Sequence, residues 1–386
     1  MVNASDGNLI YVSIQYRLGL FGFLSGGEVA KDGVLNAGLL DQRAALDWVQ
    51  RNVRAFGGDP SKVTIWGGSA GGGSVTYQLM AGGAYDEPPF SAAIAEWQPL
   101  LNQSEQESQL MTTLNLANCS TINCLRSLPV AELAYVNQAV ENASYPTGGD
   151  GFGVFYWGPV VDKRFIQELP NMAFSAGRFY DVPLMVDHEA YEGYIFSNMS
   201  LTTQTAETTD ARYLFPFAGP AFFSRLYTLY SRASFNSTFY QRQTWFGDWI
   251  IDCPTYYMAT NAVDRNTNTS AVFKLTFAAG SEVHGSTTPF LAAGVGWPAA
   301  NNHTLAEIMT SYWISFAVTQ DPNPMRVANA PFWPSYVSGG EGTAAEGESV
   351  GFDTLAVTYT TISPQQDPDA SARCDFWNGH GYQVQN

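Results

Sequence analysis

Along the chain, continuous runs of apolar residues alternate with segments in which apolar residues recur at helical spacing. This alternation predicts strands and helices in turn. Leu9–Ile14 is a continuous, largely apolar run, typical of a strand buried on both faces of a parallel sheet. Apolar residues then recur at helical spacing from Ala37 to Val53, and a Gly-Gly-Asp-Pro turn at 57–60 ends the predicted helix. A second apolar run at 63–66 predicts the next strand. Strand, helix and strand in this order indicate a right-handed crossover unit and an α/β fold.

The rest of the chain continues the pattern. Further strands are predicted at 155–161, 182–186 and 272–277, and an amphipathic helix at 304–318. The segments near 102–145 and 204–263 have helical character, the first polar and the second aromatic, and a Gly/Glu-rich surface loop is expected at 338–350. No internal repeat interrupts this order.

A sharp turn follows the strand at 63–66. It reads Gly67-Gly68-Ser69-Ala70-Gly71 and leads into a segment of small residues. The Gly-x-Ser-x-Gly pattern alone is weak in a chain rich in Gly and Ser, but the preceding strand makes it the pattern of a nucleophile elbow. The glycines would give clearance for an exposed Ser69, and the N–H of Ala70 would point to where an oxyanion forms.

A serine nucleophile needs a base, and the chain has four histidines. His284 follows the strand at 272–277, where a parallel sheet collects functional groups at its carboxyl edge. His188 follows the strand at 182–186 and is a second candidate. We expect His303, in a loop, and His380, in the tail, to be surface residues.

A carboxylate that orients the histidine is expected after the strand at 182–186. Glu192, followed by Gly193, completes the order Ser69, Glu192, His284, which is the order of α/β-hydrolases. Asp187 and Glu189 are rivals for this role. Each residue alone is more often an ordinary loop residue, so the hypothesis depends on the joint order.

Composition excludes some partners. The 386 residues carry a net charge of −17 and only 14% charged residues. Such an acidic surface repels nucleic acid and anionic membranes, so no nucleic-acid partner is expected. No apolar stretch reaches the roughly 18 residues of a transmembrane helix, so no transmembrane segment is expected.

Cysteines and sequons point to a secretory route. The chain has four cysteines, two of them close together at Cys119 and Cys124, and eight Asn-x-Ser/Thr sequons without a central Pro. Oxidised cysteines in a secreted glycoprotein are the prediction, and four buried thiols in a cytosolic enzyme are the alternative. The first residues show no signal peptide, which conflicts with the secretory reading.

Several segments, in the same order, resemble the type-B carboxylesterases, a family that includes cholinesterases and fungal secreted esterases and lipases. The matching segments are Tyr16-Arg17-Leu18-Gly19, Phe21-Gly22-Phe23-Leu24, Gly38-Leu39-Leu40-Asp41-Gln42, Ala45-Leu46-Asp47-Trp48-Val49, Phe56-Gly57-Gly58-Asp59-Pro60, Glu192-Gly193, His284-Gly285, Asp321-Pro322-Asn323 and Arg373-Cys374-Asp375-Phe376-Trp377-Asn378. This number of separate matches leaves little room for chance.

The resemblance implies an α/β-hydrolase fold whose central sheet is mostly parallel and flanked by helices. It implies one domain over 1–386, with helical insertions near 102–145 and 204–263. It also implies disulfides between Cys119 and Cys124 and between Cys253 and Cys374. Members are serine hydrolases of small-molecule or lipid esters, so the implied triad is Ser69, His284 and Glu192, with no metal and no cofactor. Oligomeric state and ester specificity are not predicted.

The chain departs from the family in two ways. The family usually has Glu directly before the nucleophile, where this chain has Gly68, and we expect that change to tune activity. Members also carry further N-terminal strands and a His-Gly-Gly-Gly-type loop that supplies other oxyanion donors. We therefore expect this sequence to be truncated at its N-terminus. The alternative to a working enzyme is an impaired or inert member that acts as a binding module.

Overall fold

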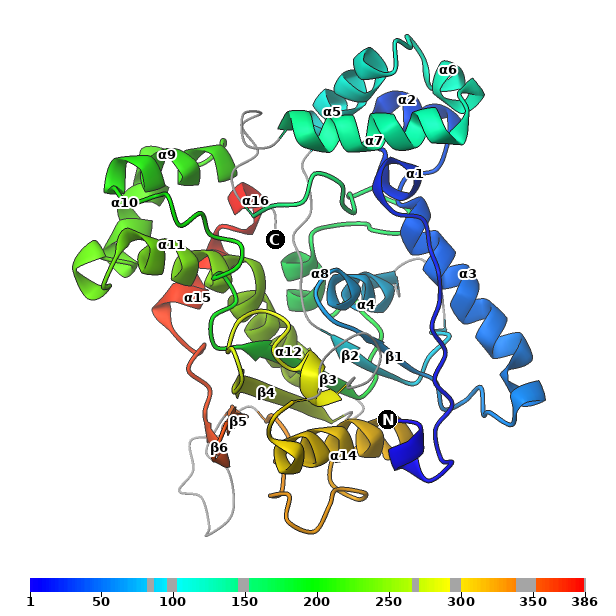
Figure 1. Ribbon diagram of the computed structural model, residues 1–386, viewed down its shortest axis with the longest axis vertical. Coiled ribbons are helices and arrows are strands. Elements are labelled where there is room, and N and C mark those ends of the chain that lie inside the picture. The colour runs from blue at the N-terminus through cyan, green and yellow to red at the C-terminus, as the bar shows by residue number, and fades with distance from the viewer. Residues whose placement is uncertain are drawn as a thin grey trace.

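The computed structural model describes residues 1–81, 87–95, 103–144, 153–265, 271–291, 300–337 and 352–384. In this part of the chain one six-stranded sheet carries helices on both faces (Figure 1). The predicted α/β class, with a mostly parallel central sheet flanked by helices, is confirmed.

The strands lie in the sheet in the order in which they occur in the sequence. They are β1 (Thr64–Gly67), β2 (Ala92–Ala95), β3 (Leu184–Glu189), β4 (Val272–Ala278), β5 (Asp353–Thr358) and β6 (Ile362–Gln366). β1 to β5 are parallel, and β6 pairs antiparallel with β5. The strands predicted at 63–66, 182–186 and 272–277 are therefore present. β3 continues to Glu189, so His188 and Glu189 lie within the strand and not after it.

Helices occupy most of the remaining described chain. They are α1 (Gly19–Phe23), α2 (Gly27–Asp32), α3 (Ala37–Asn52), α4 (Ala70–Met80), α5 (Gln103–Leu116), α6 (Ile122–Ser127), α7 (Val130–Ser144), α8 (Pro170–Ser175), α9 (Gln204–Leu214), α10 (Pro220–Leu229), α11 (Thr238–Gly247), α12 (Cys253–Arg265), α13 (Thr288–Leu291), α14 (His303–Thr319), α15 (Ala372–Gly379) and α16 (Gly381–Val384). One π-helical turn, η5 (Asp248–Asp252), joins α11 to α12. α3 and α14 confirm the helices predicted at 37–53 and 304–318.

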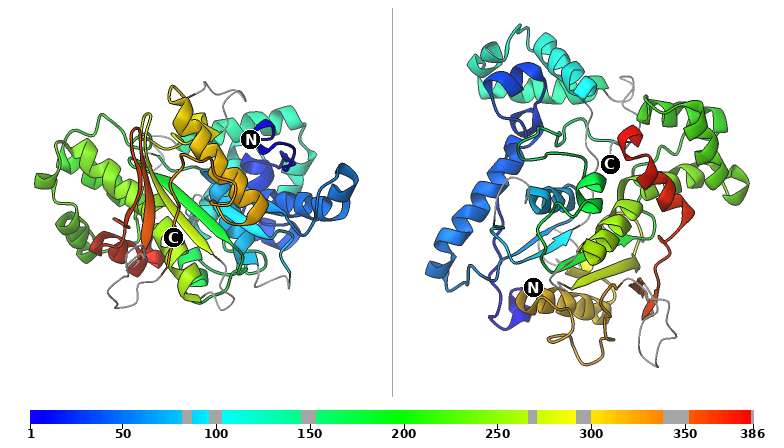
Figure 2. Two further views of the ribbon diagram at one scale, coloured as in Figure 1. Left: turned by 90° about the horizontal axis from the view of Figure 1, so that it is seen from below. Right: turned by 180° about the vertical axis from the view of Figure 1, so that it is seen from behind.

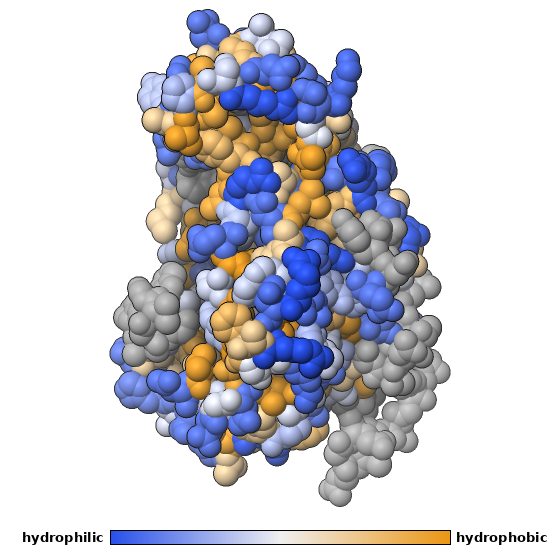
Figure 3. Space-filling view, turned by 90° about the vertical axis from the view of Figure 1, so that its right-hand side faces the viewer, coloured by the Kyte–Doolittle hydropathy of each residue, from blue (hydrophilic) through white to orange (hydrophobic). Residues whose placement is uncertain are grey.

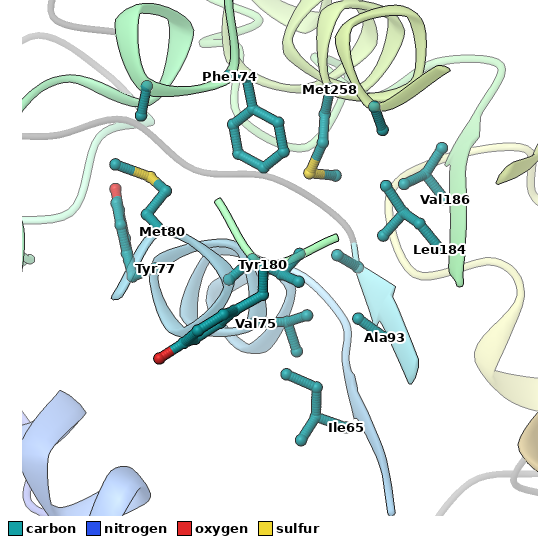
Figure 4. Close-up of a cluster of buried hydrophobic side chains, with 14 of the residues drawn as sticks. Ile65, Val75, Tyr77, Met80, Ala93, Phe174, Tyr180, Leu184, Val186 and Met258 are labelled. Atoms are coloured by element: carbon teal, nitrogen blue, oxygen red, sulfur yellow. The ribbon is translucent and has the colours of Figure 1, made fainter. Parts of the chain in front are cut away.

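The two faces of the sheet bury separate hydrophobic cores. Successive side chains of a strand point to opposite faces, so Leu184 and Val186 of β3 pack with α4, α8 and α12, whereas Met185 packs with α14. Figure 2 shows these layers from two further sides, and Figure 4 shows Met80 of α4 on the side of Phe174, with Val75 facing Ile65 and Ala93 of the sheet. The sheet is thus the middle layer of a three-layer fold.

Two groups of helices lie outside these layers (Figure 1). α5 to α7 pack with α1 and α2 around their own buried cluster. α9 to α11, η5 and α15, together with the first residues of α12, enclose an aromatic cluster in which the Phe215 ring contacts Trp245, Trp249 and Trp377. One disulfide joins Cys119, just before α6, to Cys124 within α6, and the other joins Cys253 of α12 to Cys374 of α15. These are the two pairs that the family resemblance implies.

The predicted strand at Leu9–Ile14 is wrong. The segment has no strand pairing, and Ile10, Tyr11 and Val12 are 44%, 57% and 45% exposed. An apolar run forms a strand only beside a partner that pairs with its N–H and C=O groups, and in the described sheet β1 pairs with β2 alone. Hydrophobic residues are therefore exposed on the face that Figure 3 shows, which is the right-hand side of the molecule in Figure 1.

The strand predicted at 155–161 is also wrong. Apart from one bridge position at Val160, the segment is irregular. Its aromatic residues pack locally instead, with the Tyr156 ring edge-on to Trp157. Aromatic content favours strands only where a sheet edge is available. The loop expected at 338–350 lies outside the described residues.

Candidate active site

Ser69 occupies the turn between β1 and α4. β1 ends at Gly67 and α4 begins at Ala70, so the chain reverses direction over two residues. Ser69 has φ 57° and ψ −122°, in the region that non-glycine residues rarely adopt. Backbone strain of this kind is common at functional sites, and here it follows from the abrupt change from strand to helix.

Gly67 and Gly71, the two glycines of the Gly-x-Ser-x-Gly pattern, differ in the space around them. A Cβ on Gly67 would lie 2.3 Å from the carbonyl carbon and oxygen of Gly71, so position 67 has no room for a side chain. A Cβ on Gly71 would meet no atom of the described chain within 4 Å. Gly67 therefore provides the clearance that the turn needs, and it does so by admitting the Gly71 backbone.

His284 and Glu192 meet on the loops that follow β4 and β3. The two loops are joined by a parallel bridge between Tyr191 and Val283, in which the Tyr191 N–H donates to the Glu282 carbonyl at 2.9 Å. This bridge sets the two side chains next to each other. Glu192 Oε2 accepts a hydrogen bond from His284 Nδ1 at 2.5 Å, and both side chains are buried, with exposures of 0% and 8%.

Glu192 is held on both of its oxygens. Besides the bond to His284, its Oε1 accepts from the Glu189 N–H at 2.7 Å. The following Gly193 packs so closely that a Cβ there would lie 1.9 Å from the Gln243 carbonyl oxygen. The Glu192 turn is thereby fixed against the end of α11.

The free nitrogen of His284 is positioned to act as a base. With Nδ1 donating to Glu192, Nε2 is the acceptor nitrogen, and it is buried without a hydrogen bond in the described structure. The Phe196 ring meets the imidazole edge-on at 5.0 Å. Burial lowers the pKa of His284, and the negative charge of Glu189 opposes this shift. A lowered pKa favours the neutral imidazole that can accept a proton.

The other candidates named from the sequence are not part of the hydrogen-bonded pair. His188 belongs to a separate buried ion network, with Nε2 2.8 Å from Asp369 and Nδ1 3.3 Å from Asp252. The carboxylate bonded to His284 is that of Glu192, and not that of Asp187 or Glu189. His303 begins α14, and His380 follows α15 and contacts Phe376.

Ala70 is the first residue of α4. Its N–H is among those of the first turn that have no acceptor within the helix, as the oxyanion hypothesis requires. Ser69, Glu192 and His284 follow three parallel strands of the same sheet and so come from the same edge of it.

Sequence reasoning missed the support around this pair. The sequence presents Glu189 only as a rival acid, and no pattern in it singles out Thr287, which donates to Glu189. In the described residues Glu189, Glu192 and His284 also offer ligand atoms within 4.8 Å of one another. Because His284 Nδ1 already donates to Glu192, this donor set suits proton transfer better than metal binding.

No helix in the described part of the chain combines the length and apolar character needed to cross a membrane.

Comparison with solved structures identifies the fold class. The structure superposes on Aspergillus niger EstA with a TM-score of 0.85 at 26% identity, covering 100% of this chain and 77% of that chain. A thermophilic PNB esterase matches with a TM-score of 0.74 at 23% identity, over 94% of this chain and 72% of that chain, and supports the fold alone. The molecule is therefore an α/β-hydrolase in fold.

Comparison of sequences gives the family. The profile of the carboxylesterase family matches residues 2–349, and this chain belongs to that family. It is 31% identical to carboxylesterase patB of Aspergillus clavatus, over 96% of this chain and 64% of that protein. It is 28% identical to a secreted lipase of Arthroderma benhamiae, over 84% of this chain and 63% of that protein. The chain thus spans less than two thirds of these two relatives.

Proposed function

We propose that the protein is a serine hydrolase that cleaves carboxylic esters of small molecules or lipids. The observation that carries the proposal is the buried hydrogen bond from His284 Nδ1 to Glu192 Oε2, which leaves Nε2 as an acceptor. It is supported by the strained Ser69 between β1 and α4, and by membership of the carboxylesterase family. No cofactor or metal enters the reaction as we propose it.

In the first half of the reaction, the Ser69 oxygen attacks the ester carbonyl carbon while His284 Nε2 takes the hydroxyl proton. The carbonyl oxygen becomes an oxyanion, which the Ala70 N–H stabilises as one donor. His284 then returns the proton to the departing alcohol oxygen as the bond from carbon to that oxygen breaks. The product is an acyl-enzyme on Ser69.

In the second half, His284 Nε2 takes a proton from water, which attacks the acyl carbon. The bond to Ser69 breaks, the serine oxygen recovers the proton, and the carboxylic acid leaves. Glu192 holds the imidazole in one tautomer and stabilises the imidazolium in both halves. Gly68 contributes no charge beside the nucleophile.

The test is labelling with a serine-reactive organophosphate, combined with turnover of an aryl ester. The wild-type chain should be labelled once, on Ser69, and S69A should show neither labelling nor turnover. S74A, on the same helix, is the matched control because, in the described structure, the Ser74 hydroxyl donates to the Ala70 carbonyl and accepts from Gln42. Labelling of S69A would overturn the proposal. A folded wild type that is neither labelled nor active would favour the alternative of an inert binding module.

We also propose that the chain forms a single α/β-hydrolase domain over 1–386, with insertions near 102–145 and 204–263. Each group of helices packs around its own buried cluster, as an insertion into a common sheet would. Limited proteolysis should cut within or beside these groups, and the resulting fragments should stay bound to one another through the shared sheet as one folded unit. Two separately stable halves would contradict a single domain.

We propose, finally, that the protein is a secreted glycoprotein. Two disulfides and the naming of related lipases as secreted support this. Among the sequon asparagines, Asn118 and Asn236 are exposed, whereas Asn302 Nδ2 donates to the Tyr359 carbonyl and its Oδ1 caps α14. Glycopeptide mapping after secretion from a eukaryotic host should find glycans at Asn118 and Asn236 and not at Asn302. Failure of the host to secrete the protein would count against secretion, and absence of glycan at Asn118 and Asn236 would count against a glycoprotein.

A further inference from the structure

Glu189 is a second buried carboxylate beside the proposed triad. It is the last residue of β3 and is 0% exposed. Its Oε1 accepts from the Thr287 N–H at 3.2 Å and from the Thr287 hydroxyl at 3.0 Å. Since Thr287 lies three residues after His284, this contact ties the His284 loop to the end of β3.

The other oxygen of Glu189 is unusual. Glu189 Oε2 is buried and has no hydrogen-bond partner in the described structure. A buried carboxylate oxygen without a donor is costly, so a compensating interaction is expected elsewhere. The ligand atoms of Glu189, Glu192 and His284 lie within 4.8 Å of one another, so an imidazolium on His284 would supply it.

The main chain of Glu189 acts on the same site. Its N–H donates to Glu192 Oε1 at 2.7 Å, while Glu192 Oε2 holds His284. Glu189 therefore touches both partners of the pair: Glu192 directly, through its backbone, and the His284 loop through Thr287.

We propose that Glu189 is a positioning residue of this site, whose carboxylate fixes the His284 loop through Thr287 and stabilises the imidazolium that forms in each half of the reaction. The inference rests on the proposed ester hydrolysis and adds a fourth residue to it. Glu189 does not touch the substrate and acts only through His284 and Glu192.

The charge of Glu189 has a defined effect on His284. The charged groups that face this imidazole in the described structure are Glu192, from the loop after β3, and Glu189, from β3 itself. Phe196, which packs on the ring, has no charge. A carboxylate near an imidazole favours its protonated form, so removing the Glu189 charge should make the imidazolium less stable.

The test compares E189Q, E189D and E207Q. Glu207 is the matched control because it is also 0% exposed and hydrogen-bonded, to Trp245 and Gln204, on α9. E189Q should lower kcat about tenfold or more with little change in KM, and should move the acid limb of kcat/KM to lower pH by roughly half a unit or more. E189D should restore part of kcat, and E207Q should leave the acid limb in place. Wild-type kcat and acid limb in a folded E189Q would overturn the proposal.

A second measurement is independent of turnover. Imidazole nitrogens of His284 are followed by NMR across pH in S69A and in S69A/E189Q, both checked for folding by their melting curves. The His284 midpoint should fall by half a unit or more when Glu189 is replaced. An unchanged midpoint would overturn the proposal. If wild-type Ser69 fails to react with an organophosphate, the proposed function fails, whereas this titration still reports on Glu189.

Discussion

His284 Nδ1 and Glu192 Oε2 lie 2.5 Å apart, although 92 residues separate them in the sequence. Their loops leave neighbouring parallel strands, β3 and β4, and the bridge between Tyr191 and Val283 holds those loops together. The hydrogen bond is thus set by the sheet register and does not depend on flexible contacts.

Replacing Glu192 by Gln should keep the fold and remove most activity. The amide is close to the carboxylate in size, but it cannot stabilise an imidazolium and it favours the wrong tautomer of His284. We expect kcat to fall by about 10³- to 10⁴-fold, with a smaller change in KM. Steady-state kinetics on an aryl ester, with circular dichroism to verify folding, measures this. A loss of less than tenfold in E192Q would argue against Glu192 as the acid of the triad.

Replacing Gly67 by Ala should disrupt the nucleophile turn. The new Cβ would overlap the Gly71 carbonyl group, which is backbone and cannot rotate away. We expect a loss of about 1–3 kcal/mol in the free energy of unfolding and slower organophosphate labelling of Ser69. Urea unfolding and labelling rates measure the two effects.

Gly71 provides the control for this variant. A Cβ at Gly71 meets open space in the described chain, and Ala is a better helix residue than Gly by about 1 kcal/mol. G71A should therefore unfold at the same urea concentration as the wild type or higher. If G67A and G71A lose equal stability, the packing of Gly67 against Gly71 is not the constraint.

The disulfides should contribute unequally to stability. Cys253 and Cys374 are 121 residues apart, whereas Cys119 and Cys124 are 5 apart. If chain entropy of the unfolded state dominates, C253A/C374A loses about 5 kcal/mol and C119A/C124A about 2 kcal/mol. Urea unfolding without reductant compares the two double variants. Equal losses would show that the entropy of the unfolded chain is not the main contribution.

Sequence patterns predicted those elements whose signal is local. β1, β3, β4, α3 and α14 each have several apolar residues at one period, and the turn at Ser69 has a pattern of its own. The proposed triad of Ser69, Glu192 and His284 combines the edge rule for parallel strands with the chain order of α/β-hydrolases, and the sequence alone left Asp187 and Glu189 as rivals for the acid.

Features that depend on tertiary contacts between distant segments could not be predicted from the sequence. The apolar run Leu9–Ile14 has strand composition, but pairing needs a neighbour that composition does not show. Glu189 and Thr287 meet because two loops are bridged, and no spacing in the sequence indicates this contact. His188 and Glu189 are adjacent in sequence, yet the pleat of β3 sends them to opposite faces, and so to different networks.

His188 should make stability depend on pH. Burial alone would lower its pKa, but Asp369 and Asp252 outweigh burial and raise the pKa of His188 to about 9. The folded chain therefore binds the imidazole proton more tightly than the unfolded chain does, in which the pKa of histidine is about 6.5. Its stabilisation is complete below about pH 6.5 and is lost as pH rises to about 9.

The free energy of unfolding should therefore fall between pH 6.5 and 9, by on the order of 3 kcal/mol at most. Burial raises the pKa of Asp248 to about 6, so its contribution is lost as pH rises toward 6, below this range. Burial also raises the pKa of Asp252, and the ionisation of that carboxyl lowers stability in the same direction as pH rises. Urea unfolding at half-unit steps of pH measures the slope. H188Q should be less stable at pH 6.5, because Asp252 and Asp369 lose a partner, and its stability should fall less steeply toward pH 9 than that of the wild type. H303Q, which removes an exposed histidine, should keep the wild-type slope. A wild-type stability that stays constant or rises from pH 6.5 to 9 would show that His188 is not held as an imidazolium between the two aspartates.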